Sequence, residues 1–448
     1  MNGHLSAHQP CNTASADRHF LTHMVRKHTQ VGIVGAGPAG LLLGHLLHRH
    51  GIESVILEKR SRDYIEHRVR AGVLEQASVD LLVATGVGDR LRKEGLVHHG
   101  IELRFGGVGH RIDLTDLSGG KSITVYGQQE VVRDLIQARI AADDELLFEV
   151  KSVTLRDVDS SCPRICFEQY GEEIELSCDV IAGCDGFHGV CRSSIPAQSL
   201  SFFERSYPFA WLGILAQAPP TREELIYAYH ERGFALYSMR SPQITRLYLQ
   251  VVPDEDLTAW SDQRIWQELH ARLETDSAWS LREGPILEKG IAGMRSFVVE
   301  PMQYGRLYLA GDAAHIVPPT GAKGMNLAIA DVFVLSNALR EFFSAGCMDL
   351  LDGYSQTCLK RVWRAEHFSW WMTSMLHRFP DDPFQEKLQH SQLDYVVNSH
   401  VAAASLAESY VGLPLSPGRA TLGGTDGPQA FHHHNLQRRQ DADRISLK

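Results

Sequence analysis

The feature that most constrains the fold is a glycine-rich turn between two short apolar segments near the start of the chain. Residues 31–40 read V-G-I-V-G-A-G-P-A-G, and residues 55–58 read V-I-L-E. An apolar run, a glycine turn, a helix and a second apolar run ending in an acid form the unit that binds dinucleotides. A glycine triplet alone also marks ordinary turns in α/β proteins. The spacing and the terminal acid favour the dinucleotide site.

The chain has a suitable residue for each role in a dinucleotide-binding unit. Gly35 would allow the tight turn, and Gly37 would let a pyrophosphate approach the backbone at the helix N-terminus. Gly40 would let the helix pack closely on the sheet, and Glu58 would hold the ribose hydroxyls of an adenosine. We therefore predict that these four residues bind a dinucleotide cofactor.

Two later segments indicate which dinucleotide is bound. Residues 178–188 (C-D-V-I-A-G-C-D-G-F-H) form an apolar strand that enters an Asp-Gly turn, and residues 305–315 (G-R-L-Y-L-A-G-D-A-A-H) form a strand that ends in Gly-Asp. Either segment alone would be read as a surface turn after a buried strand. Together with the glycine turn, and in this order, they resemble the flavoprotein aromatic hydroxylases. In that family the Gly-Asp carboxylate, here Asp312, contacts the ribitol of FAD.

The resemblance extends over residues 30–415 and is carried by long matching stretches. These stretches are residues 68–76, 125–128, 232–236, 316–324, 368–374 and 410–414. The resemblance implies an α/β fold, with a discontinuous Rossmann-like FAD-binding domain, a β-sheet substrate domain and C-terminal helices.

The dinucleotide-binding segments are interrupted in the sequence by segments with β-like alternation, such as residues 247–252. We therefore expect interleaved domains with polar tails. The expected divisions are a disordered N-terminal extension at 1–29, an FAD-binding domain at 30–96, 125–206 and 296–330, a substrate domain at 97–124 and 207–295, a helical interface region at 331–415, and a disordered tail at 416–448.

Composition excludes several classes of protein. The formal net charge of −10 argues against a nucleic-acid partner, because binding a polyanion needs clustered basic side chains. No apolar run approaches the roughly 18 residues that cross a bilayer, so we expect no membrane association. The eight cysteines lack paired metal-ligand spacing and read as free thiols, so we predict a cytoplasmic protein without a metal site.

Five apolar residues near the C-terminus fall on one face of a predicted helix. They are Phe368, Trp371, Met372, Met375 and Phe379. Such a stripe is typical of a core or of a subunit interface. In the resembled family the C-terminal helices contribute to a homodimer, and we expect the same here.

The resemblance implies hydroxylation of 4-hydroxybenzoate to 3,4-dihydroxybenzoate with FAD, NADPH and O₂, the oxygen being delivered by a flavin C4a-hydroperoxide. Because this electrophile needs an electron-rich ring, a phenolate reacts far better than a phenol. The protein must then bind an aromatic acid, remove its phenolic proton and exclude water. Two alternatives are a sister hydroxylase for another hydroxy- or aminobenzoate and a flavin-binding sensor without turnover.

The resemblance assigns the substrate carboxylate to Arg240, with Ser238 and Tyr248 beside it. A guanidinium offers a planar fork that meets a carboxylate with two parallel hydrogen bonds. Without the resemblance, residues 238–241 would read as a surface turn.

At the phenolic end, the resemblance implies a proton relay. Tyr227 would hydrogen-bond the phenolic oxygen, Tyr410 would contact Tyr227, and His98 would connect them to solvent. Histidine suits the outer end because its reference pKa lies near neutrality. The carbonyl of Pro319 would be a backbone acceptor near the same oxygen. Taken alone, the tyrosines would be core residues and His98 a surface residue.

Further residues match family positions around the two cofactors. Those near the flavin are Arg70, Gln128, Asp312, Lys323, Asn326 and Arg246, the last of which governs movement of the flavin between buried and exposed positions. Those for NADPH are Arg60, Tyr64, Arg68, His188 and Arg295. Clustered cations suit a 2′-phosphate, but a charge run is usually a solvated face, so NADH also stays open.

Overall fold

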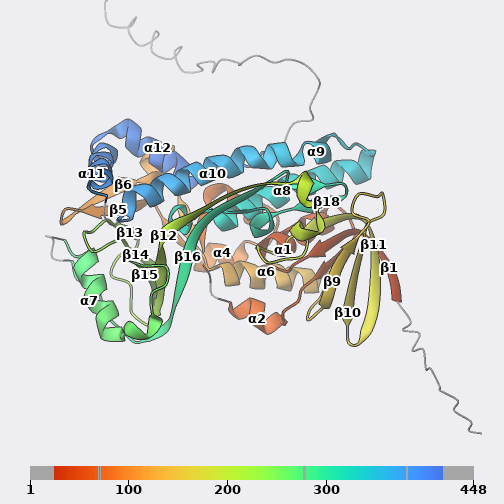
Figure 1. Ribbon diagram of the computed structural model, residues 1–448, viewed down its shortest axis with the longest axis horizontal. Coiled ribbons are helices and arrows are strands. Elements are labelled where there is room, and N and C mark those ends of the chain that lie inside the picture. The colour runs from red at the N-terminus through yellow and green to blue at the C-terminus, as the bar shows by residue number, and fades with distance from the viewer. Residues whose placement is uncertain (1–24, 69, 71, 276–278, 380–381, 417–448) are drawn as a thin grey trace, which may run out of the picture.

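The computed structural model describes residues 25–68, 70, 72–275, 279–379 and 382–416, and the arrangement is shown in Figure 1. Two eight-stranded sheets and one three-stranded sheet form its framework. The predicted tails at 1–24 and 417–448 lie outside the described residues.

The first sheet contains the glycine turn. Its strand order is β17 (Gln303–Tyr304), β18 (Leu307–Leu309), β11 (Glu172–Gly183), β1 (Val25–Val34), β2 (Ser54–Leu57) and β8 (Leu146–Leu147), with β10 (Arg164–Gln169) pairing with β11 and β9 (Lys151–Arg156). Strand β1 pairs in parallel with both β2 and β11, and β11 pairs in parallel with β18. The carboxyl ends of these strands therefore meet at one edge, where ligands bind in open α/β sheets.

Strand β1 begins earlier than predicted. Residues 25–29, which were expected to belong to a disordered extension, pair with residues 174–178 of β11 in parallel register. The first four residues, V-R-K-H, have exposed side chains, so no alternation of apolar and polar residues marks this part of the strand in the sequence. Backbone pairing, rather than side-chain burial, extends this strand.

The second sheet carries the segments predicted for the substrate domain. Its order is β19 (His315–Ile316), β16 (Ile286–Glu300), β12 (Ser201–Ala216), β15 (Ile244–Val251), β14 (Ala235–Ser241), β13 (Leu225–Ala228), β5 (Gly100–Phe105) and β6 (Val108–Asp113). The long strands β12 and β16 pair along most of their length and run from the β13–β15 end of the molecule toward the first sheet (Figure 1). The predicted boundaries at 206/207 and 295/296 therefore fall inside continuous strands, not in linkers.

A small sheet and the helices complete the fold. The small sheet is β3 (Val73–Glu75), β7 (Ile123–Val125) and β4 (Leu96–His98). The helices are α1 (Pro38–Arg49), α2 (Arg62–His67), α3 (Gln76–Ala84), α4 (Asp89–Glu94), α5 (Leu114–Leu117), α6 (Gln128–Ala141), α7 (Asp262–Leu273), α8 (Gly324–Ala345), α9 (Asp349–Asp352), α10 (Tyr354–Leu376), α11 (Pro383–Asn398) and α12 (His400–Val411).

Helix α8 runs through the predicted boundary at 330/331 without a break and packs on α1. The aromatic stripe lies on α10 and just beyond its end. Phe368, Met372 and Met375 are almost fully buried within the chain, and Trp371 and Phe379 pack against the same cluster. The stripe is therefore core within one chain.

The composition predicts neither a membrane-spanning helix nor a disulfide, and the described residues bear on both predictions. None of the described helices is long and apolar enough to cross a membrane. The seven cysteines in the described ranges, which exclude Cys11, are free thiols.

Candidate active site

The predicted pyrophosphate cradle is built from backbone. Gly35 has φ +105°, which favours glycine, and a Cβ at Gly40 would lie 1.9 Å from the Gly35 carbonyl oxygen. Gly37 caps α1 without a side-chain hydrogen bond, and a Cβ placed on Gly37 would meet no described atom within 4 Å. The helix N-terminus is therefore open beside Gly37, as an approaching pyrophosphate requires.

Glu58 lies at the end of β2 and is buried. Its Oε2 accepts a hydrogen bond of 2.9 Å from the Ala36 N–H, and its Oε1 accepts one of 2.8 Å from the Arg60 N–H. The carboxylate thus braces the glycine turn from below. A carboxylate has about four acceptor positions, so these bonds leave capacity for a ribose hydroxyl.

Two of the predicted flavin residues face each other across the edge of the cradle. Arg70 Nη1 lies 4.0 Å from Asp312 Oδ2, and both side chains are about half exposed. Asp312 belongs to the 3₁₀ turn η4 (Gly311–Ala313) after β18, whereas Gln128 is the first residue of α6. Burial, together with the nearby Arg68, lowers the pKa of Arg70.

The predicted substrate residues share one face of the second sheet. Antiparallel pairing sets Tyr227 opposite Leu236, Leu236 opposite Tyr248, and Ser238 opposite Arg246. Directly paired residues point to the same face, and so do alternate residues along a strand. The β14–β15 register shifts between Met239 and Ser241, so Arg240 lies at an irregularity of the kind that often re-aims a side chain beside a site.

Two guanidinium groups on this face lack acidic partners. No described carboxylate lies within ion-pair distance of Arg240 or Arg246, and Nε and Nη1 of Arg246 are buried without hydrogen-bond partners in the described chain. Arg240 donates from Nη2 to the Arg70 carbonyl, and burial lowers the pKa of Arg240. Partly buried cations without counter-ions favour binding of an anion.

The two predicted tyrosines are in direct contact. Tyr227 on β13 and Tyr410 on α12 share a hydrogen bond between their hydroxyls, and both are almost fully buried. Burial raises the pKa of each phenol above its ordinary value. Both hydroxyls are therefore neutral near pH 7 and can pass a proton without storing charge.

His98 differs from its predicted place at the solvent end of the relay. It is 1% exposed on β4, and burial lowers its pKa to about 4. Both ring nitrogens lack partners among the described residues, and no hydrogen bond there joins His98 to Tyr410. A buried, neutral imidazole can accept a proton only in passing. The sequence could not show this, because β4 is a three-residue strand whose burial depends on its neighbours in the fold.

Lys323, Asn326 and Pro319 make bonds within the protein. Lys323 Nζ donates 2.8 Å bonds to Glu75 Oε1 and to the Tyr410 carbonyl, and burial lowers its pKa. Asn326 accepts from the Glu75 N–H. The Pro319 carbonyl already accepts from the Ala322 N–H, although a carbonyl has a second lone pair.

Glu75 is a residue that the sequence argument missed. Its carboxylate also accepts from Arg361 at 3.0 Å, so one buried acid links β3, the start of α8, and α10. Glu75 stands inside the stretch 68–76, but its lysine partner is 248 positions away. The only available signal was a charged residue beside an otherwise apolar segment.

The residues predicted for NADPH form two groups in the described structure. In the first group, the guanidinium carbons of Arg60 and Arg68, which flank α2 in sequence, lie 5.1 and 5.8 Å from the ring of Tyr64 on that helix. In the second group, His188, which follows the Asp-Gly turn, and Arg295 on β16 both contact the ring of Phe187. No described contact joins the two groups. Arg62, by contrast, is paired with Glu66 at 2.7 Å.

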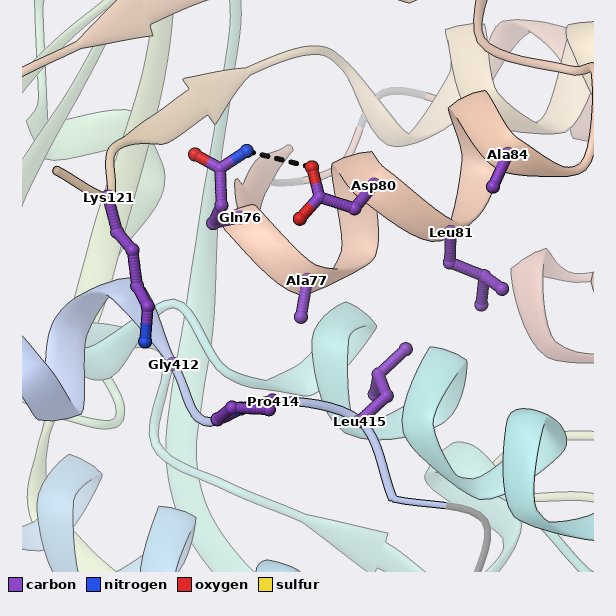
Figure 2. Close-up of a pocket in the computed structure, with 9 residues that line it drawn as sticks. All are labelled: Gln76, Ala77, Asp80, Leu81, Ala84, Lys121, Gly412, Pro414 and Leu415. Atoms are coloured by element: carbon purple, nitrogen blue, oxygen red, sulfur yellow. Dashed lines mark hydrogen bonds between the residues drawn. The ribbon is translucent and has the colours of Figure 1, made fainter. Parts of the chain in front are cut away.

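A surface pocket of about 370 Å³ lies apart from these residues, between α3 and the segment Gly412–Leu415 (Figure 2). Gln76 donates to Asp80 at its rim at 2.9 Å. None of the predicted site residues is among the nine that line it.

A family model described as an FAD binding domain matches residues 28–369. The p-hydroxybenzoate hydroxylase of Acinetobacter baylyi is 52% identical over 387 residues, which cover 86% of this chain and 96% of the relative. The chain belongs to this family of flavoprotein hydroxylases. As a member, it is an FAD-dependent monooxygenase, and the open cradle at Gly37 fits that cofactor.

Two monooxygenases with lower sequence identity support the fold. The 6-hydroxy-3-succinoylpyridine 3-monooxygenase of Pseudomonas putida is 26% identical over 344 residues, which cover 72% of this chain and 82% of that protein. The crystal structure of p-nitrophenol 4-monooxygenase from Pseudomonas putida has a TM-score of 0.75 at 18% identity, covering 87% of this chain and 99% of that chain. The predicted α/β fold is confirmed.

Proposed function

We propose that this enzyme hydroxylates 4-hydroxybenzoate to 3,4-dihydroxybenzoate with NADPH and O₂. One observation carries the proposal: two guanidinium groups without acidic partners lie on the same sheet face as a hydrogen-bonded pair of buried tyrosines. A substrate with an anionic group at one end of an aromatic ring and a phenolic hydroxyl at the other would match the guanidinium groups and the tyrosine pair, respectively. The A. baylyi relative, whose name states this substrate, supports the same choice.

The spacing along β14 suits such a ring. Leu236, opposite Tyr227, lies four residues from Arg240, or about 13 Å at roughly 3.3 Å per residue. A para-hydroxy aromatic acid with a hydrogen bond of roughly 3 Å at each end spans this gap. Arg240 would hold the carboxylate, with Ser238 and Tyr248 beside it.

At the other end, Tyr227 would take the phenolic hydrogen bond and pass the proton to Tyr410. The two hydroxyls are hydrogen-bonded and buried, so the proton would move without a charge resting on either. His98 would accept the proton transiently through a bridging water or the substrate. The surrounding apolar cluster would keep bulk water away from the reacting ring.

FAD supplies the oxygen-transferring chemistry when it is bound. Gly35, Gly37 and Gly40 would hold its pyrophosphate, Glu58 its ribose, and Arg70, Gln128 and Asp312 its phosphate and ribitol. Lys323 and Asn326 would support the loop near the ring, with the Pro319 carbonyl beside the substrate, and Arg246 would govern flavin movement. We assign the first sheet to the FAD unit and the β5, β6 and β12–β16 sheet to the substrate unit.

The proposal is tested by the choice of substrate. NADPH consumption and product identity would be measured with 4-hydroxybenzoate, 3-hydroxybenzoate, 4-aminobenzoate and 4-hydroxybenzamide. We expect 3,4-dihydroxybenzoate from the first, and no stimulation by the amide, which lacks the carboxylate. Hydroxylation of the amide at an equal rate would contradict the anion site. Preferred turnover of 4-aminobenzoate would favour a sister hydroxylase.

NADPH, rather than NADH, is the reductant in this proposal. Arg60 and Arg68 both lie over the ring of Tyr64, and neither has an acidic partner among the described ion pairs. Free cations of this kind can read a 2′-phosphate, and His188 and Arg295 would hold another part of the nucleotide. Arg60→Ala should lower the ratio of kcat/KM for NADPH to kcat/KM for NADH. Arg62→Ala is a matched control, because the charge of Arg62 is already paired with Glu66. Equal losses for NADH and NADPH would mean that Arg60 only attracts anions.

The proposal includes a homodimer formed through α11. Phe384, Leu388 and Tyr395 are 74%, 48% and 59% exposed, and their spacing puts them on one helical face. The opposite face packs into the chain through Gln389, Leu393 and Val396. If two copies of α11 pair antiparallel about a twofold axis, Lys387 of one copy faces Asp394 of the other. The exposed apolar face of α11 and its flanking charges are thus complementary to the same face of a second copy.

Sedimentation of the holoenzyme tests this interface. Leu388→Asp should yield monomer, whereas Tyr170→Ser changes an exposed aromatic residue on another surface and should not. Lys387→Asp alone should weaken the dimer, and Lys387→Asp combined with Asp394→Lys should restore it. A dimer that is indifferent to all three changes on α11 would reject this surface. We further place the enzyme in the cytoplasm, which suits its free thiols.

A further inference from the structure

One buried carboxylate holds both ends of the turn that carries Asp312. Asp331 Oδ2 accepts a 2.9 Å hydrogen bond from the Gly311 N–H and a 2.7 Å hydrogen bond from His315 Nε2. Gly311 precedes Asp312, and His315 follows it at the start of β19. The same oxygen therefore fixes the first and last residues of the segment 311–315.

Asp331 is well placed to be rigid. It lies in the middle of α8 and is 2% exposed, as is His315. Burial alone would lower the pKa of His315, but the contact with Asp331 outweighs burial and raises it. The turn also lies directly on this helix, since a Cβ on Gly311 would be 3.1 Å from the Ala328 Cβ.

The turn itself needs such support. Gly311 has φ +63°. The side chain of the next residue, Asp312, is about half exposed and has no hydrogen bond within the described chain, and its nearest charged partner is Arg70 Nη1 at 4.0 Å. A mobile carboxylate would lose conformational freedom when it contacts a ligand. Fixing the backbone on both sides of Asp312 lowers that entropic cost.

We propose that Asp331 is a positioning residue for the flavin: by gripping Gly311 and His315 it holds the Asp312 carboxylate where the ribitol of FAD binds. The inference rests on the proposed role of Asp312. It predicts that Asp331, without touching the cofactor, retains FAD by acting through Asp312. Loss of Asp331 should then matter only while Asp312 is present.

The test is the rate at which FAD leaves the holoenzyme after dilution, followed by the rise in flavin fluorescence. Four proteins form a cycle: the parent, Asp312→Ala, Asp331→Ala and the double variant. We expect Asp331→Ala to speed release by roughly tenfold, as for one lost hydrogen bond to a charged group. In the Asp312→Ala background the same change should have less than about a third of that effect.

Two further variants separate positioning from general stability. Asp331→Asn keeps an oxygen that can accept both hydrogen bonds, so it should release FAD nearly as slowly as the parent. Ser336→Ala removes another buried polar group of α8 that does not touch the turn, and should leave release unchanged. If Asp331→Ala does not yield folded holoenzyme, His315→Leu takes its place in the cycle, because leucine has no donor and so removes the hydrogen bond from residue 315 to Asp331.

The outcomes are distinct. An equal effect of Asp331→Ala in both backgrounds, or none in either, overturns the positioning role. Unchanged FAD release in Asp312→Ala would instead remove the proposed contact of Asp312, and with it the basis of the inference. Strong loss in Asp312→Ala together with no loss in Asp331→Ala would reject the inference alone.

Discussion

The proposed phosphate cradle and the proposed substrate face, which is the side of the second sheet that carries Tyr227, Ser238, Arg240 and Tyr248, are built in opposite ways. The cradle lies within residues 31–58 and presents backbone, with Glu58 bracing the turn from within the same segment. The substrate face presents side chains from β13, β14 and β15 together with Tyr410, which is 183 positions from its partner Tyr227. A local backbone motif can be read from spacing alone, whereas a face assembled from distant side chains requires the fold.

The largest effect should come from the cradle glycine that packs inside the protein. Gly40→Val places carbon atoms where the Gly35 carbonyl lies, since even a Cβ would be 1.9 Å from that oxygen. Gly37→Val meets no described atom within 4 Å. We expect Gly40→Val not to accumulate as folded protein, and Gly37→Val to fold but lose its yellow colour.

Thermal unfolding and flavin absorbance measure the two effects separately. The cradle assignment predicts that Gly37→Val unfolds within a few degrees of parent apoprotein. Full FAD occupancy in purified Gly37→Val would show that no pyrophosphate approaches this turn.

On the substrate face, Arg240→Ala should weaken binding of 4-hydroxybenzoate on the order of 100-fold or more, as for a truncated buried charge pair. Substrate-stimulated flavin reduction should fall with it, while FAD stays bound, because the cradle is untouched. Arg240→Lys keeps the positive charge but loses the planar guanidinium. Its dissociation constant for 4-hydroxybenzoate should therefore lie between those of the parent and of Arg240→Ala. An unchanged dissociation constant in a flavin-absorbance titration would remove Arg240 from the site.

The sequence predicted these two regions unequally. Strand, turn and helix around Gly37 follow from local spacing and match the observed β1, α1 and β2. The burial of His98, the bonds of Lys323 to Glu75 and the pairing of Arg62 with Glu66 depend on neighbours that pattern alone does not specify. The predicted boundaries at 206/207 and 295/296 could not be checked against strand ends from pattern alone, because each falls inside one of the continuous strands β12 and β16.

The tyrosine pair sharpens the comparison, because it should affect chemistry without affecting binding. Tyr227→Phe and Tyr410→Phe keep Arg240 and the cradle, so both should bind substrate and reduce flavin. Hydroxylated product per NADPH should fall roughly tenfold or more, since less phenolate forms, with hydrogen peroxide released instead. The phenolate absorbance of bound substrate, followed as pH rises, is the measurement. If bound 4-hydroxybenzoate ionises as readily in both variants as in the parent, the two tyrosines contribute packing and no proton relay.

The smallest expected effect concerns the buried imidazole of His98 on β4. The pKa of His98 is lowered to about 4 by burial, against roughly 6.5 for an exposed histidine in the unfolded chain. Between these values the unfolded chain binds more protons, so the free energy of unfolding falls as pH drops from about 6.5 to about 4. We expect the free energy of unfolding of His98→Leu to fall by on the order of 2 kcal/mol less than that of the parent over this pH range. Above pH 7 the substitution should change the pH dependence little. Urea unfolding at a series of pH values measures this, and the exposed His67→Leu controls for loss of a surface imidazole. An equally steep decline in His98→Leu and the parent would mean that His98 is accessible to protons in the folded state, which would return it to the solvent end of the relay.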